Sequence, residues 1–543
     1  MWKKPWKCLP GQDRGAWLKT WSRRNNFFSE RMREITMRKK LLGIDLGTGG
    51  CKTTFIDLDG NICASSFKEY PSEHHRPGWS EQDPSLWINA VLNTVKDCKS
   101  QMSDGFSGVI CLAVTASTHN AVLLDKHGEV IRRCIMWNDQ RSGSQCESLK
   151  QQYDEPIFRI GMQRPTPTWT LPQLMWVREN EPENYARIDR IMFTKDYVRS
   201  WLTGDFCTDV VDAQGSLLYD AREMKWSPEL CGMIGLPLQT LPEIRLSKEI
   251  VGHVRAEAAR LTGLPEELPV IAGCSDTAAE DFSAGATKVG QIIVKLATAG
   301  NVNVVADMAN PHSKTFTYPY SIEGLWYTVT ATNSCASAYR WLRDSLYCGD
   351  KAACEKNGEE VYRLMDEEAS SVPLGARGLI FHPYLLGERC PYFNPKARGD
   401  FFGLSVVHSR PHFARALLEG VAFSLYDCLQ VLADFNRNLE DIAIIGGGAK
   451  SPLWSQIICD VFGLEVKFPR NAESSYGGAL LAGVGAGVFQ SEYEAAYKCI
   501  KMNKTYVPNM ENHEKYLKYY KIYKEIADAS FPIWENLALI ANE

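Results

Sequence analysis

LLGIDLGTGGCKTTFIDLDG, residues 41–60, consists of a short apolar segment, a glycine-rich turn and a second segment rich in β-branched residues. This composition predicts two strands joined by a tight turn. Backbone N–H groups exposed in such a turn attract phosphate oxygens. Asp45 is placed to hold the hydration shell of a Mg²⁺ ion, and Thr48 and Lys52 are placed to reach a phosphate. Taken alone, the motif fits an ordinary β-turn equally well.

A similar pattern, IIVKLATAGNVNVV, begins at Ile292 and turns through Ala297-Thr298-Ala299-Gly300. Two such hairpins, each opening one half of the chain, predict two α/β domains that face each other across a cleft and supply turns to one phosphate tail. Alternating apolar strands and helical periods place the junction near residues 283–290. A third glycine cluster, residues 446–450, is open to an adenosine or, as the alternative, is a strand-to-helix turn with glycines for close packing.

Further blocks of sequence resemble the FGGY carbohydrate kinase family, and the resemblance runs from Met37 to about Trp534. The blocks occur in family order: PGWSEQDPSLW (77–87), CIMWNDQRSG (134–143), TKDYVRSWLTGDFCTDVVDAQGSLLYD (194–220), LLGERCPYFNPKARGDFFGLS (385–405) and PHFARALLEGVAFSL (411–425). Thr118-His119-Asn120 followed by IMWND is most similar to the xylulokinases of that family. The resemblance implies two actin-like (ribonuclease H-like) ATPase domains of α/β class with a central cleft.

The expected organisation has four parts. Residues 1–36 form a basic extension or follow from a misassigned start, and residues 37–285 form the N-terminal kinase domain with the sugar site, the first phosphate turn and the catalytic aspartate. Residues 286–500 form the C-terminal domain with the second phosphate turn and the adenosine site, and residues 501–543 form a helical tail.

Asp276 follows the apolar strand LPVIAG and opens an alanine-rich helix. Read from the residues alone, Ser275 or Asp276 is a helix N-cap. The resemblance reverses that preference, because it makes the aspartate of this turn the base that accepts the proton of the sugar hydroxyl. It also implies Mg²⁺ at Asp45 and three sets of ligand-binding residues. These are Gly47, Thr48, Gly49, Lys52, Thr298 and Gly300 for the phosphates, Gly447, Gly448 and Ala449 for adenosine, and His119, Asn120, Trp137, Asn138, Asp139 and Thr277 for the sugar.

The implied reaction transfers the γ-phosphoryl group of ATP to a ketose, with D-xylulose converted to D-xylulose 5-phosphate. Gln173 stands where the family usually has lysine, Thr277 stands where xylulokinases typically have asparagine, and Ala297 replaces a glycine in the second turn. These departures keep another acceptor open, such as ribulose, erythritol, glycerol or gluconate. A protein that senses sugar without catalysis is a further alternative.

Composition agrees with an ordinary globular enzyme. The resemblance implies a cytoplasmic protein with a small-molecule sugar, ATP and Mg²⁺ as its partners. A net charge of −5 provides no general attraction to nucleic acid, and the 17 cysteines show no metal-binding spacing. We find no apolar run near the roughly 20 residues that span a bilayer, so no membrane partner is expected. A homodimer is retained as a candidate assembly.

Overall fold

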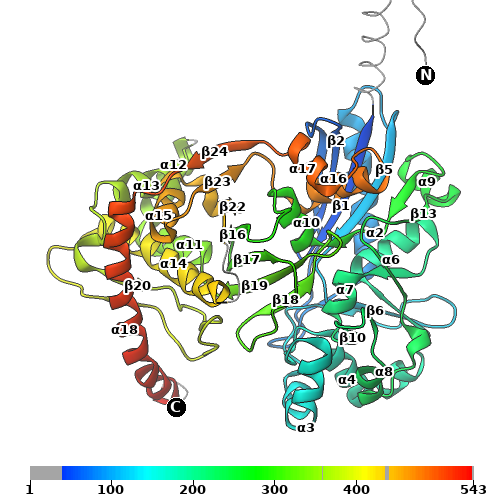
Figure 1. The fold of residues 1–543 in the computed structure, drawn as a ribbon, viewed down its shortest axis with the longest axis horizontal. Coiled ribbons are helices and arrows are strands. Elements are labelled where there is room, and N and C mark those ends of the chain that lie inside the picture. The colour runs from blue at the N-terminus through cyan, green and yellow to red at the C-terminus, as the bar shows by residue number, and fades with distance from the viewer. Residues whose placement is uncertain (1–38, 358, 435–438, 541–543) are drawn as a thin grey trace, which may run out of the picture.

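The computed structural model describes residues 39–357, 359–434 and 439–540. The expectation for residues 1–36 lies outside this part of the chain. Figure 1 shows two lobes, and in the described residues each is built around a seven-stranded sheet. We call them the first lobe and the second lobe.

The first lobe contains a sheet in the order β13-β14-β5-β1-β2-β3, with β15 also paired to β5. Its strands are β1 (Lys40–Gly47), β2 (Gly50–Asp57), β3 (Ile62–Glu69), β5 (Val109–Ala116), β13 (Ile250–His253), β14 (Pro269–Ile271) and β15 (Cys274–Ser275). The longer helices around it are α2 (Pro84–Gln101), α3 (Gly143–Gly161), α4 (Thr170–Asn180), α6 (Thr194–Thr203), α7 (Val210–Gly215), α9 (Ala256–Thr262) and α10 (Asp276–Ser283). Smaller elements complete the lobe: β4 (Glu81–Gln82), β6 (Ala121–Leu124), β7 (Cys134–Ile135), α5 (Pro182–Ala186), β8 (Arg190–Phe193), β9 (Cys207–Asp209), β10 (Tyr219–Asp220), β11 (Lys225–Trp226), α8 (Pro228–Met233) and β12 (Glu243–Arg245).

The second lobe contains a sheet in the order β18-β19-β17-β16-β22-β23-β24. Its strands are β16 (Ile292–Leu296), β17 (Gly300–Ala306), β18 (Phe316–Pro319), β19 (Trp326–Thr332), β22 (Ile442–Ile445), β23 (Val466–Pro469) and β24 (Met502–Tyr506). Around it lie α11 (Ala336–Leu346), α12 (Cys348–Asn357), α13 (Val361–Ser370), β20 (Ile380–His382), β21 (Asp400–Phe402), α14 (Arg410–Ala433), the 3₁₀ turn η3 (Gly447–Lys450), α15 (Pro452–Phe462) and α18 (Met510–Ile540).

The two sheets repeat one arrangement. In the first, β1 pairs antiparallel with β2 and parallel with β5; in the second, β16 pairs antiparallel with β17 and parallel with β22. The register Gly47↔Gly50 leaves a two-residue turn, and Leu296↔Gly300 leaves a three-residue turn. Both glycine-rich stretches of the sequence are therefore the hairpins that were expected.

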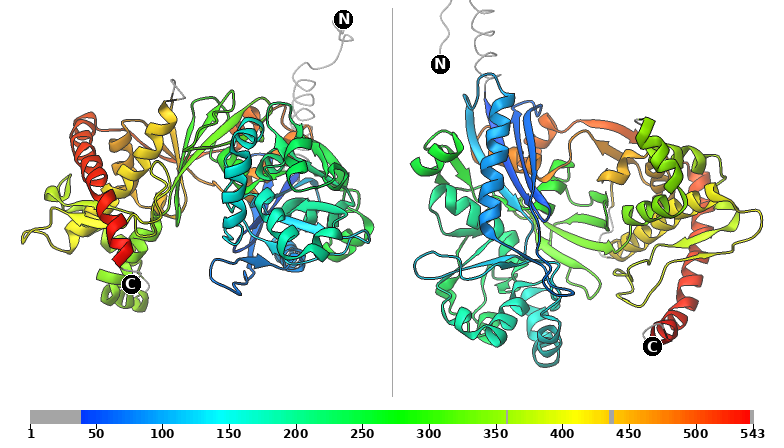
Figure 2. Two further views of the ribbon diagram at one scale, coloured as in Figure 1. Left: turned by 90° about the horizontal axis from the view of Figure 1, so that it is seen from below. Right: turned by 180° about the vertical axis from the view of Figure 1, so that it is seen from behind.

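The chain returns from the second lobe to the first. Helices α16 (Ser474–Gly485) and α17 (Glu492–Cys499) follow β23 in sequence, yet α16 packs on β1, β5 and α10, as the orange helices beside the blue strands show in Figures 1 and 2. A Cβ atom on Gly43 of β1 would lie 1.8 Å from the Ser475 carbonyl oxygen, so only glycine permits this approach. The segment 286–500 is thus not confined to the second lobe.

The predicted tail at 501–543 is not purely helical either. It begins with β24, which joins the edge of the second sheet by pairing with β23. Only then does α18 run along the second lobe, where Tyr516 and Tyr523 are buried.

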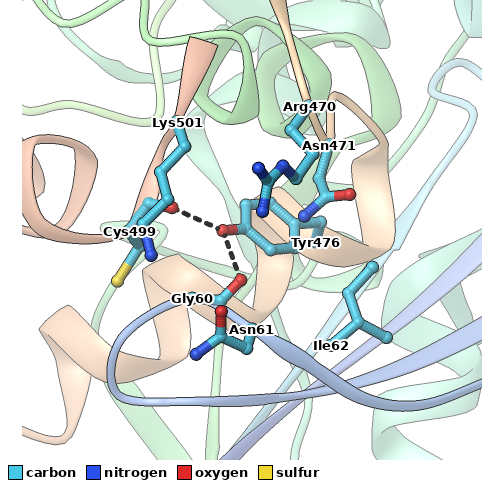
Figure 3. Close-up of a pocket in the computed structure, with 8 residues that line it drawn as sticks. All are labelled: Gly60, Asn61, Ile62, Arg470, Asn471, Tyr476, Cys499 and Lys501. Carbon is cyan, nitrogen blue, oxygen red and sulfur yellow. Dashed lines mark hydrogen bonds between the residues drawn. The ribbon is translucent and has the colours of Figure 1, made fainter. Parts of the chain in front are cut away.

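The return segment is fixed to the first lobe close to the point where the chain crosses between the lobes. Tyr476 Oη is 3.0 Å from both the Gly60 and Cys499 carbonyl oxygens (Figure 3). The Arg470 amide donates to the Lys501 carbonyl oxygen at 2.8 Å, which ties the outgoing and returning segments together. These bonds form one wall of a cavity of about 210 Å³ that lies apart from the glycine-rich turns.

Helix α14 forms the centre of the second core and is the one helix in the described residues that is long and apolar enough to cross a membrane. Of its most apolar window, 78% is buried inside the protein. The length and composition of α14 are therefore those of a core helix.

Candidate active site

The turn between β1 and β2 contacts the loop that was expected to bind the sugar. Trp137 Nε1 donates to Thr48 Oγ1 at 2.8 Å, and Gln82 Nε2 donates to the Thr48 carbonyl oxygen at 2.7 Å. Gly49 is exposed at the tip of the turn, whereas Gly47 accepts a hydrogen bond from Tyr70 Oη through its carbonyl oxygen at 2.6 Å. The phosphate turn and the indole of Trp137 therefore lie next to each other.

Asp45 lies at the end of β1, where its Oδ1 accepts a hydrogen bond from Thr115 Oγ1 at 2.8 Å. Burial raises the pKa of Asp45 to about 8, and the negative charge of Asp276 is the next cause. Asp45 is in register with Thr115 of β5, and Thr115 is in register with Cys274 of β15, so strand pairing brings Asp276 close to Asp45. The first phosphate turn and the start of α10 thus meet at one point.

Ser275 takes the helix-capping role at α10. Its Oγ accepts from the Ala278 amide at 3.2 Å, which satisfies an amide at the helix start. Asp276 Oδ1 instead accepts from the Thr277 amide at 2.6 Å and from Thr277 Oγ1 at 3.2 Å. In the part of the chain that the structure describes, no hydrogen bond involves Asp276 Oδ2, so this oxygen is available to a ligand.

Two further charged residues join this group and were not identified from the sequence. Glu280 lies one turn after Asp276 on α10 and forms an ion pair with Lys295 of β16. Although burial opposes it, the negative charges of Glu280 and Asp276 raise the pKa of Lys295. The i,i+4 spacing of Asp276 and Glu280 was a signal that both carboxylates share one helix face. Lys295 therefore brings a positive charge from the second lobe to the carboxylates of the first.

His119 is almost fully buried and adopts a left-handed backbone conformation, with φ = 77°. Its Nδ1 lies 2.6 Å from the Gly215 carbonyl oxygen, and burial lowers the pKa of His119 to about 4. Because a carbonyl oxygen only accepts, Nδ1 carries the proton and the neutral ring keeps a lone pair on Nε2. Gly215 is required here, since a Cβ atom would lie 2.2 Å from Thr118 Oγ1. His119 can therefore accept a hydrogen bond from a sugar hydroxyl.

Two predicted sugar-binding residues hold loops through their polar atoms. Asn120 is buried; its Nδ2 donates to Ser117, and its Oδ1 accepts from the Trp137 amide at 2.7 Å. Asp139 is 1% exposed, and its oxygens accept from the Ser80 amide and from the amide and guanidinium of Arg141. Their polar atoms are paired within the protein in this geometry, and the direct sugar contact expected of each stays a prediction.

Asn138 also lies elsewhere. It is exposed and lines a hollow of about 500 Å³ with residues 74–80. Lys52 forms an ion pair with Glu473, the residue before α16, so its ammonium is neutralised by the return segment. The contacts of Asn138 with the sugar and of Lys52 with phosphate therefore stay predictions, and a phosphate would compete with Glu473 for Lys52.

Gln173 stands where the family usually has lysine, and its side-chain amide donates hydrogen bonds within the protein. It is buried, and its Nε2 donates to the carbonyl oxygens of Met136, Pro167 and Thr168 at 3.1–3.4 Å. The amide thus links the segment before Trp137 to the loop before α4. Its Oε1 has no partner among the described residues.

The second turn packs against the start of α11. The Thr298 carbonyl oxygen accepts from the Cys335 amide at 3.1 Å and from Ser337 Oγ at 2.7 Å, while Thr298 Oγ1 lies 3.5 Å from Arg340 Nη2. Gly300 is buried, and a Cβ atom there would lie 2.8 Å from Leu425. Gly300 is thus needed for packing, and Thr298 remains exposed at the tip of the turn.

Gly447 and Gly448 line a cavity of about 820 Å³ in the second lobe. Tyr339, Tyr362 and Trp454 supply aromatic walls, and Asp366 accepts from Tyr339 Oη at 2.8 Å. The lining also includes charged side chains such as Lys351 and Lys450, and a concave site of this size with aromatic walls and polar groups suits a nucleotide. Ala449 is buried and lies outside the lining of this cavity, and its contact with adenosine stays a prediction. Arg340 lines the same cavity and connects it to Thr298.

The groups therefore follow one another in a path. The cavity at Gly447 leads through Arg340 to Thr298, and β16 of the same hairpin carries Lys295 to the carboxylates. Thr277 bonds to Asp276, and the Trp137 loop bonds to the first phosphate turn. A nucleoside cavity, phosphate-binding turns, carboxylates and polar side chains for an acceptor are thus arranged in sequence. This arrangement suits transfer of a phosphoryl group between two bound molecules.

The family models for the FGGY family of carbohydrate kinases match residues 40–283 (N-terminal domain) and 298–486 (C-terminal domain). The xylulose kinase of Bacillus subtilis (strain 168) is 30% identical over 480 residues, which cover 87% of this chain and 94% of that protein. A gluconokinase from the same organism is 26% identical, with coverage of 87% and 92%. The crystal structure of xylulose kinase from Rhodospirillum rubrum has a TM-score of 0.84 at 27% identity and covers 92% of this chain and 100% of that one. With both domains matched in order, the chain belongs to the FGGY family of carbohydrate kinases and is a sugar kinase that uses ATP as its phosphate donor.

Proposed function

We propose that this protein phosphorylates a ketose, with D-xylulose as the acceptor and D-xylulose 5-phosphate as the product. The observation that carries the proposal is the meeting of Asp45 and Asp276. Strand pairing brings the phosphate turn close to Asp276, a carboxylate that does not cap the helix. Thr277 bonds to Asp276, and Trp137 bonds to the phosphate turn.

In the proposed reaction, the cavity at Gly447 and Gly448 holds adenosine, and Thr298 with Lys295 directs the triphosphate toward the first lobe. Asp276 takes the proton of the acceptor hydroxyl while the sugar oxygen bonds to the γ-phosphorus and the bond to the ADP oxygen breaks. Thr277 holds Asp276 Oδ1 through two hydrogen bonds and so fixes the direction of Oδ2.

Mg²⁺ fits this site by the chemistry of the donors. Asp45, Asp276 and Glu280 repel one another, and Lys295 is the positive charge that offsets them in the described residues around Asp45. No cluster of three or more metal-ligating side chains occurs in the described residues. Mg²⁺ bound by proteins usually keeps several of its waters. Asp45 would hold such a hydrated ion, which supplies charge neutralisation at the phosphates when bound.

The sugar side favours a neutral acceptor over a sugar acid. His119 is neutral, and Trp137 and Thr277 carry no charge. Arg141 is the guanidinium near this wall, but it is 1% exposed on its side chain and bound to Asp139 and Glu81. Among the described residues around His119, no free cation is therefore present for the carboxylate of gluconate. Relatives named xylulose kinase support the same acceptor.

The test is ADP release with a panel of D-xylulose, D-ribulose, erythritol, glycerol and gluconate. Highest kcat/KM for D-xylulose supports the proposal, and a clear preference for gluconate refutes the argument from the neutral wall. Sugar-dependent thermal stabilisation without turnover identifies a sensor instead. We further propose a cytoplasmic protein without a membrane partner, and sedimentation analysis decides whether it forms the predicted homodimer.

A further inference from the structure

Strand β18 belongs to the second sheet but lies against the first lobe. It is the edge strand of that sheet, paired only with β19 in the described residues, and it packs on α7 (Figure 1). Gln163 Nε2 of the first lobe donates to the Thr317 carbonyl oxygen of this strand. The edge of the second sheet is therefore fixed beside the segment that holds His119.

Tyr318 of β18 faces this junction. Its ring centre lies 6.2 Å from that of His119 and 6.0 Å from that of Trp169. On its other side it stacks on Tyr327 at 5.2 Å, with 18° between the ring planes. The ring is thus held firmly, with only 7% of the residue exposed.

The Tyr318 hydroxyl makes no hydrogen bond in the described residues and is not among their fully buried oxygens, so it opens toward solvent. Fully buried tyrosine hydroxyls usually have a partner within the protein. Tyr320, two residues later, shows the usual case, because its Oη donates to the Ala286 carbonyl oxygen at 2.8 Å. Burial raises the pKa of Tyr318, and the charge of Asp276 is the next cause. The Tyr318 ring therefore lies near His119, and its hydroxyl is close enough to Asp276 for that charge to raise its pKa.

We propose that Tyr318 completes the sugar site from the second lobe by donating a hydrogen bond from its hydroxyl to a hydroxyl of the acceptor. This inference rests on the proposed function. His119 Nε2 accepts a hydrogen bond from a sugar hydroxyl, and the Tyr318 hydroxyl donates one to the sugar. The two groups together therefore select both the position and the orientation of the sugar hydroxyls. Because Tyr318 comes from the second lobe, the bound sugar also links the two lobes.

Tyr318→Phe isolates this contact, since phenylalanine keeps the stacking on Tyr327 and removes only the hydroxyl. Loss of one hydrogen bond to a neutral partner predicts a fall of about 3- to 15-fold in kcat/KM for D-xylulose, mainly through a higher KM. The KM for ATP and the ATP hydrolysis without sugar should stay within about twofold of the unmodified protein. The preference for D-xylulose over D-ribulose should narrow, which a purely structural role would not cause.

Tyr320→Phe is the matched control, because it also removes a tyrosine hydroxyl from this segment. The Tyr320 hydroxyl donates to a backbone carbonyl oxygen and is not proposed to contact the sugar. It should leave the sugar kinetics unchanged. Sugar kinetics of Tyr318→Phe equal to those of the unmodified protein overturn the inference and leave the proposed function intact. An equal loss in both variants also overturns it, because the effect then belongs to the packing of the segment. If the unmodified protein turns over another sugar of the panel, the same comparison is made with that sugar. If it neither binds nor turns over any of them, the proposed function and this inference fall together.

Discussion

Asp45→Asn should make the ligand-free protein more stable at pH 8 while removing a group needed for its activity. The substitution keeps the size of the side chain, and the amide oxygen can still accept from Thr115 Oγ1. It removes a carboxylate whose ionisation is opposed by burial and by the charge of Asp276. Stability and activity are therefore expected to change in opposite directions.

The magnitude follows from the difference in pKa between the two states. The pKa of Asp45 rises from 3.8 to about 8 on folding, so the folded state binds more protons than the unfolded chain between these values. The free energy of unfolding therefore falls as pH rises from about 4 to about 8, and the loss is complete above the folded pKa. At about 1.36 kcal/mol for each pH unit the upper limit is about 6 kcal/mol. Because the side chain is only partly shielded from water, we expect about 2–3 kcal/mol.

The assay compares thermal unfolding of the two proteins, both free of nucleotide and metal, from pH 5 to pH 8.5. Other groups titrate in this range, but they are common to both proteins, so the difference in Tm isolates Asp45. As the pH rises, the Tm of the variant should increase relative to the Tm of the unmodified protein, by a few degrees in total. In the Asp276→Asn background the same comparison should give a smaller gain, because one of the charges that raises the pKa of Asp45 is gone.

Parallel curves for the two proteins across this pH range would refute the reasoning, since they would mean that Asp45 ionises as easily in the folded protein as in the unfolded chain. A variant that loses stability at pH 8 would show that the carboxylate makes a favourable contact that outweighs burial. Either result would also mean that the charge of Asp276 does not govern the ionisation of Asp45.

Two further substitutions test the catalytic base and the packing of the return segment. Asp276→Asn should lower kcat by a factor of about 100 to 10,000 with nucleotide affinity retained, and near-normal turnover would exclude Asp276 as the base. Gly43→Ala should cost about 2–4 kcal/mol, because its Cβ atom would overlap the backbone of α16. Gly49→Ala is the matched control on the same hairpin, where a Cβ atom meets nothing within 4 Å, and equal Tm values for the two glycine variants would contradict the packing argument.

Local chemistry made the hairpins predictable from sequence. The turns at 47–50 and 296–300 form where glycine and small residues interrupt β-branched segments, and both turns lie where expected. The return of α16 to the first lobe could not be predicted in the same way. Its sequence SSYGGALLAGVG specifies a helix with small faces, but nothing local says which sheet those faces approach. That choice depends on Gly43, more than 400 residues earlier in the chain.

The sequence predicted where the site residues lie better than it predicted what each side chain contacts. The WND segment contains a side chain that bonds to the phosphate turn, Trp137, one that points to another hollow, Asn138, and one that is fully paired, Asp139. A motif identifies all three equally, because its residues may be needed to shape a loop as much as to touch a ligand. Tyr318 was missed for the opposite reason. It lies in a short edge strand without a motif, and only the packing of two lobes brings it to the site.

The charges at the site also determine how metal binding should depend on pH. In the ligand-free protein, the negative charges of Asp276 and Glu280 oppose the ionisation of Asp45. A bound divalent cation attracts all three carboxylates and so favours their ionised forms. Mg²⁺ must displace the proton that Asp45 carries below its pKa of about 8, so its affinity should rise between pH 6 and pH 8. The increase in Tm that Mg²⁺ produces should therefore be larger at pH 8 than at pH 6 in the unmodified protein and nearly independent of pH in Asp45→Asn. A pH-dependent increase that survives in the variant would place the ion at other carboxylates. If Mg²⁺ raises the Tm at neither pH, the ion binds only together with ATP. The phosphates of ATP would then supply ligands that Asp45 alone does not provide.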